Sequence, residues 1–145
     1  MTCKVGNIRT VSLPEPRVEW LPDNRQMRLL EPYEFCFCRG PEHIHAYIPE
    51  GFEFDGASIP RVAWATTGSP YVGNHRKPAL THDASYVKGM LRRVDTGEEI
   101  ILTRKEADAL LLSGCIFEGM GWYTRNKIWL AVRAAGWKYY RDGEG

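Results

Sequence analysis

The chain has 145 residues, of which 43% are hydrophobic and 26% are charged, and its 19 Lys plus Arg nearly balance its 18 Asp plus Glu, which leaves a formal net charge of +1. This composition excludes a disordered chain, and the near-neutral charge argues against a nucleic-acid partner. We expect one domain over residues 1–145, with no transmembrane segment and no signal peptide, because no apolar run approaches about 18–20 residues and the N-terminus carries no apolar segment.

The prolines divide the chain into two parts. Eight of the nine lie within the first 70 residues, and the last is Pro78. Because proline disrupts the interior of a helix, we expect strands and loops in residues 1–77 and helices in residues 78–140. This order predicts the α+β class, with a small N-terminal antiparallel β-sheet packed against three C-terminal α-helices.

Two alternating segments predict a β-hairpin. Residues 33–38 and 43–48 alternate between apolar and polar side chains, and residues 39–42 between them fit a four-residue hairpin loop. In the register that this loop imposes, one face of the hairpin is apolar and consists of Phe35, Phe37, Ile44 and Ala46. Shorter strands are expected at residues 17–20 and 27–30.

The other face of the hairpin gathers side chains that can bind zinc. In the predicted register each cysteine faces a histidine, with Cys38 opposite His43 and Cys36 opposite His45. Cysteine and histidine are common zinc ligands, so these four residues form an alternative metal site. Four ligands on one flat face do not readily surround a tetrahedral ion, however, and an edge hairpin with a mildly polar face is the competing interpretation.

Three helices are expected in the second half. Residues 79–90 follow the last proline, which suits a first helical turn. Thr103 and Glu106 have the spacing of a capping box, which predicts a helix over residues 104–117. The third helix is expected over residues 122–140, with one apolar face made by Ile128, Ala131, Val132 and Ala135. Aromatic and basic residues alternate along this helix, which is typical of a core or partner-binding surface.

The first two helices carry a candidate acid–base pair. His82 and Tyr86 are four residues apart and therefore share one helical face. His82 could act as a general base if a carboxylate held its other ring nitrogen, and Asp108, one turn into an antiparallel neighbouring helix, is the candidate. We therefore predict that His82 lies within about 2.6–3.2 Å of the Asp108 carboxylate, or one water away from it. An ion pair of Asp108 with Arg104, four residues before it, is the competing interpretation.

Two further carboxylates are candidate ligands of a hard cation. Asp83 follows His82 on the predicted helix, and Asp55 lies in a turn-rich segment that we expect to approach the same pocket. Carboxylate oxygens are the ligands that Ca²⁺ and Mg²⁺ prefer, and such a cation would polarise a carbonyl or stabilise an oxyanion. The alternatives are that Asp55 caps a turn and that Asp83 forms a surface salt bridge.

Three motifs in order along the chain resemble a known family. They are Asp55-Gly-Ala-Ser-Ile-Pro60, His82-Asp-x-x-Tyr86 and Arg104-x-x-x-Asp108. Together they resemble a family of small proteins of unknown function from tailed bacteriophages and prophages. The resemblance implies a phage-encoded protein that assembles with other phage proteins and is located in the virion or the host cytoplasm. It favours a virion- or tail-associated structural or assembly component in which the His–Asp pair is a buried polar network.

The same motifs are also similar to the core of the bacterial and fungal type of secreted phospholipase A2. That similarity implies the alternative function of a small esterase or phospholipase A2-like hydrolase assisted by a divalent cation. Carried over by motif, His82 would be the base, Asp108 its partner and Tyr86 a support for the pair, and these three are the predicted catalytic set. Asp55 and Asp83 would be calcium ligands.

Overall fold

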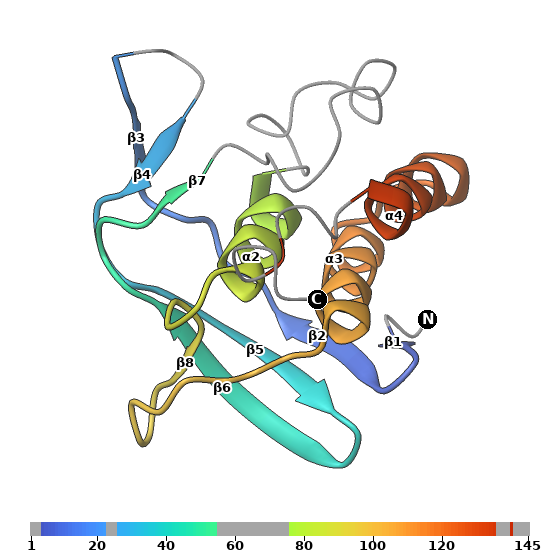
Figure 1. The fold of residues 1–145 in the computed structure, drawn as a ribbon, viewed down its shortest axis with the longest axis horizontal. Coiled ribbons are helices and arrows are strands. Elements are labelled where there is room, and N and C mark those ends of the chain that lie inside the picture. The colour runs from blue at the N-terminus through green and yellow to red at the C-terminus, as the bar shows by residue number, and fades with distance from the viewer. Residues whose placement is uncertain (1–3, 23–25, 55–75, 136–139, 141–145) are drawn as a thin grey trace.

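Strands occupy most of the first half of the described chain and helices most of the second, which confirms the α+β class (Figure 1). The computed structural model describes residues 4–22, 26–54, 76–135 and 140. Its α-helices are Arg76–Tyr86 (α2), Arg104–Phe117 (α3) and Trp122–Ala135 (α4). In these described ranges no helix is long and apolar enough to cross a membrane.

The strands form two antiparallel sheets. The larger sheet contains Lys4–Val5 (β1), Ile8–Ser12 (β2), Tyr33–Arg39 (β5), Glu42–Ile48 (β6) and Arg92–Arg93 (β8), in the order β1-β2-β5-β6-β8. The smaller sheet contains Val18–Trp20 (β3), Met27–Leu29 (β4) and Glu53–Phe54 (β7), in the order β3-β4-β7. The strands expected near residues 17–20 and 27–30 are therefore present, and they belong to the second sheet.

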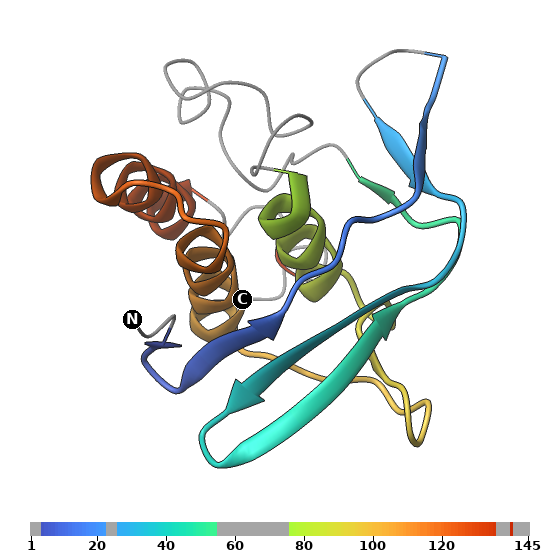
Figure 2. The same cartoon turned by 180° about the vertical axis from the view of Figure 1, so that it is seen from behind.

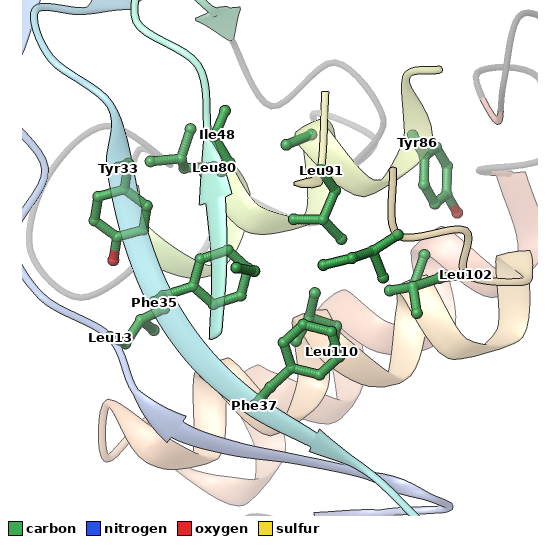
Figure 3. Packing of buried hydrophobic residues seen from close by; sticks show 14 of the residues in the cluster. Leu13, Tyr33, Phe35, Phe37, Ile48, Leu80, Tyr86, Leu91, Leu102 and Leu110 are labelled. Atoms are coloured by element: carbon green, nitrogen blue, oxygen red, sulfur yellow. The ribbon is translucent and has the colours of Figure 1, made fainter. Parts of the chain in front are cut away.

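Helices α2 and α3 cover one face of the larger sheet, and α4 packs against α3 farther from the sheet (Figures 1 and 2). The apolar face of the β5–β6 hairpin points into the core. Figure 3 shows Phe35 and Phe37 directed toward side chains of α2 and α3, among them Leu80 and Leu110. A second cluster joins α4 to α2 and α3, and it consists of Ala79, Leu111, Cys115, Met120, Ile128 and Val132.

The predicted hairpin register is confirmed. Phe37 pairs with Ile44 and Cys38 with His43, and the apolar residues are buried while both histidines are exposed. The predicted four-residue loop is wrong. Arg39 pairs with Glu42, so the two strands are each one residue longer and the turn between them has two residues. Gly40 in this turn has a φ of 59°, a left-handed conformation that glycine adopts without steric cost.

The helix starts and ends follow local chemistry. The capping box of α3 is confirmed, since the Thr103 side chain accepts from the Glu106 backbone and the Glu106 side chain accepts from the Thr103 backbone. Helix α2 differs from the prediction, because it begins at Arg76 and ends at Tyr86. The chain leaves the helix there to reach a turn in which the Gly89 backbone N–H donates to Glu99. Residues 136–139 of the predicted third helix lie outside the described residues.

The two-residue strands were not predicted. Among them, β8 lies in the part of the chain expected to be helical, where Arg92 pairs with Tyr47 and Arg93 with Ala46. A strand of two residues is too short to show an alternation of apolar and polar side chains. It is defined by its pairing with a neighbouring strand, which the local sequence does not reveal.

Helices α2 and α3 approach each other closely where Gly114 of α3 faces Pro78 of α2. A Cβ atom at Gly114 of α3 would lie 3.4 Å from the Cβ of Pro78 on α2. We expect Gly114→Leu to lower the free energy of unfolding by about 1–3 kcal/mol, measured by urea denaturation, because a longer side chain must push the helices apart. Gly114→Ala is the control, and it should leave the stability unchanged or raise it by up to about 1 kcal/mol through its helix propensity. Equal stability of the leucine and alanine variants would contradict this account.

Candidate active site

The centre of the candidate site is a hydrogen bond between two helices. His82 on α2 and Asp108 on α3 are both fully buried, and the His82 Nε2 lies 2.8 Å from the Asp108 Oδ1. The distance falls within the range predicted from the sequence. It arises because α2 packs against α3 and because the capping box places Asp108 in the first turns of its helix.

Tyr86 contributes a second donor to the same oxygen. It lies one turn after His82 on α2, its ring centroid is 4.3 Å from that of His82, and its hydroxyl donates to the Asp108 Oδ1. Burial is the main cause that raises the pKa of Tyr86 well above its ordinary value. The hydrogen bond to Asp108 and the negative charge of Asp108 raise it further. Tyr86 therefore remains protonated and acts as a hydrogen-bond donor across the neutral pH range.

Two arginines face the other oxygen of the carboxylate. The Nη1 of Arg133, on α4, donates to the Asp108 Oδ2 at 2.8 Å, and the Nη1 of Arg104 lies 3.7 Å from the same oxygen. The ion pair with Arg104, which was the competing interpretation of the sequence, therefore coexists with the bond to His82. The part of Arg133 in the site was not predicted, because no local sequence pattern relates it to a residue on another helix.

The charge state of Asp108 fixes the arrangement of protons. Burial alone would raise the pKa of its carboxyl, but the hydrogen bond and charge of His82 and the bonds from Tyr86 and Arg133 outweigh burial, and the pKa lies below its ordinary value. An ionised carboxylate only accepts hydrogen bonds, so the proton of the bond to His82 resides on Nε2. The bond therefore fixes the orientation of the His82 ring, which is what a general base requires of its carboxylate partner.

The predicted cation ligands are described only in part. Asp83 is buried on α2 directly after His82, whereas Asp55 lies outside the described residues. Within the described residues no group of three or more His, Cys, Asp or Glu side chains is arranged to hold a metal ion. The described chain thus supplies one of the two predicted carboxylates, which is buried on the helix that carries His82.

The alternative zinc site is not supported by the geometry. The set Cys36, Cys38, His43 and His45 lies fully within the described residues and forms no group suited to a metal. The Cys38 Sγ accepts from Arg9 at 3.3 Å, and the His45 Nε2 lies 2.9 Å from the Glu34 Oε1. Burial, followed by the charge of Glu34, raises the pKa of the Cys36 thiol. We therefore do not propose zinc binding here.

The chain matches a known protein family. The family described as a protein of unknown function (DUF1353) matches residues 27–132, which include His82, Tyr86 and Asp108. The matched region covers well over half of the 145 residues, and the chain belongs to this family. No curated protein and no solved structure matches the chain.

Proposed function

We propose that this DUF1353 protein is a small hydrolase in which His82 is the general base. The observation that carries the proposal is the buried bond from the His82 Nε2 to an ionised Asp108, because a carboxylate on one ring nitrogen orients the ring and stabilises the positive charge that it gains as a base. Asp108 and Tyr86 act as positioning residues, which hold the ring and balance the charge that it acquires.

The proposed reaction is the hydrolysis of an ester by water. The His82 Nδ1 takes a proton from water while the water oxygen bonds to the carbonyl carbon, and the carbonyl π-electrons move to oxygen. Asp108 stabilises the resulting imidazolium, as the carboxylate does in other His–Asp pairs. Collapse of the tetrahedral intermediate breaks the bond to the leaving alcohol, which receives the proton from Nδ1. A general base of this kind contributes about 10²–10⁴-fold to the rate.

Phospholipids are the proposed class of ester, and calcium is the proposed cation. Both follow from the similarity of the motifs to secreted phospholipases A2, which implies Asp83 and Asp55 as the calcium ligands. A bound cation would stabilise the negative charge that develops on the carbonyl oxygen. In this proposal Asp83 and Asp55 hold the ion, and His82 is the residue that accepts the proton.

The proposal is tested by assaying the purified protein against a p-nitrophenyl ester and phosphatidylcholine vesicles, each with Ca²⁺ and with EDTA. We expect hydrolysis by the wild-type protein, loss of hydrolysis in His82→Gln, and wild-type rates in His43→Gln, whose histidine is exposed on the hairpin. Absence of hydrolysis of both substrates under both conditions would contradict the proposal.

A second candidate function is a structural component of a phage virion or tail, with other phage proteins as partners. The observation that favours it is the exposure of large apolar side chains on α4, where Trp122, Tyr123 and Leu130 are 68%, 73% and 60% exposed. Exposed aromatic side chains are typical of protein interfaces. In this function the His82–Asp108 bond would serve stability alone, and His82→Gln would still support assembly and infectivity.

A further inference from the structure

We propose that Arg133 is a positioning residue that fixes the Asp108 carboxylate in the orientation that His82 requires. The inference rests on the proposed function, in which His82 is the base. It adds a residue of α4 to the site, whereas the sequence motifs place site residues only on α2 and α3.

The two oxygens of Asp108 accept from different helices. Oδ1 accepts from His82 and Tyr86 on α2, whereas Oδ2 accepts from Arg133 on α4 at 2.8 Å. The terminal torsion of an aspartate is broad when nothing restrains it. Because rotation of the carboxylate would break the bond to Arg133, that bond keeps Oδ1 directed at the His82 Nε2.

The two arginines have different contacts and therefore different roles. The Arg104 Nη1 lies 3.7 Å from Oδ2, and its guanidinium donates instead to the backbone carbonyls of Val132 and Arg133, at 3.3 Å and 3.4 Å. Arg104 thus holds the backbone of the last turn of α4, where partial negative charge accumulates. Arg133 makes the direct bond to the carboxylate.

The charges predict that the fold tolerates loss of Arg133. Among the described residues, the groups that face Asp108 are His82 and Tyr86 on α2, Arg104 on its own helix and Arg133 on α4. When Arg133 is replaced by a neutral residue, Arg104 remains within 4 Å to balance the carboxylate. The side chain of Arg133 is also 30% exposed, so its removal opens the site to water and leaves no buried cavity.

The test compares Arg133→Gln and Arg133→Lys with Arg125→Gln, in which the replaced guanidinium lies on the same helix and donates to the Met120 carbonyl. On an ester that the wild-type protein hydrolyses, we expect kcat to fall about 10–100-fold in Arg133→Gln, as for the loss of other orienting hydrogen bonds. We expect an unchanged KM, partial recovery in Arg133→Lys, and wild-type values in Arg125→Gln. Proton NMR supplies an independent readout, since the His82 Nε2–H bound to a carboxylate should give a downfield resonance that shifts in Arg133→Gln.

Two results would overturn the inference. One is wild-type kcat together with an unchanged His82 resonance in Arg133→Gln, and the other is an equal loss in Arg125→Gln. If the wild-type protein hydrolyses no ester, the proposed function fails and the resonance alone decides the role of Arg133: a shift confined to the Arg133 variants supports it, and no shift overturns it. If Arg133→Gln does not fold, Arg133→Lys provides the same readouts.

Discussion

Asp108→Asn is expected to lower the free energy of unfolding at pH 7 by about 3 kcal/mol. The carboxylate is fully buried and accepts hydrogen bonds from His82, Tyr86 and Arg133. The substitution removes the negative charge that these three side chains contact. Breaking a buried ion pair from one side costs about 3–5 kcal/mol, and the lower end applies because both guanidinium groups retain contact with water. Urea denaturation measures the loss.

The pH dependence of this difference follows from the pKa of Asp108. Because the folded protein holds that pKa below its ordinary value, the ionised form stabilises the fold at every pH above the unfolded pKa of about 3.9. The contribution is lost as the pH falls from there through the folded pKa. The gap between the wild-type protein and Asp108→Asn should therefore be constant from about pH 5 to 7 and shrink below about pH 4. Asp95→Asn, at an exposed turn, is the control, and an equal loss in that variant would contradict the account.

Phe37→Ala is expected to lower the free energy of unfolding by about 3–5 kcal/mol, because truncation of a buried phenylalanine leaves a cavity. Phe37 is completely buried, and its ring centroid lies 5.8 Å from that of Phe35 on the same strand. Phe117→Ala is the matched control, since Phe117 is 39% exposed at the end of α3 and should cost about 1 kcal/mol or less. Similar losses in both variants, measured by urea denaturation, would contradict the position of the hairpin in the core.

The parts of the fold that depend on local chemistry could be predicted from the sequence. Strict alternation set the hairpin register, and the Thr103–Glu106 spacing located the start of α3. The bond between His82 and Asp108 was also accessible, because helical spacing and an antiparallel neighbouring helix suffice to bring the two residues together. In each case the sequence pattern that supports the prediction lies within one element or two consecutive elements.

The parts that the sequence did not predict depend on contacts between distant elements. Strand β8 has two residues and exists because Ala46 and Tyr47 pair with it. Arg133 reaches Asp108 across 25 positions of sequence, and nothing near Arg133 distinguishes it from the other basic residues of α4. Only the packing of α4 against α3, through residues such as Ile128 and Val132, brings it to the site.

The central claim is that His82 accepts a proton during ester hydrolysis. The most direct measurement is the initial rate of hydrolysis of phosphatidylcholine vesicles by the wild-type protein and by His82→Gln, at equal concentration and after both are shown to be folded. Glutamine can still donate to Asp108 but cannot accept a proton, so the account predicts a rate about 10²–10⁴-fold lower in the variant. Equal rates in the two proteins would contradict the claim.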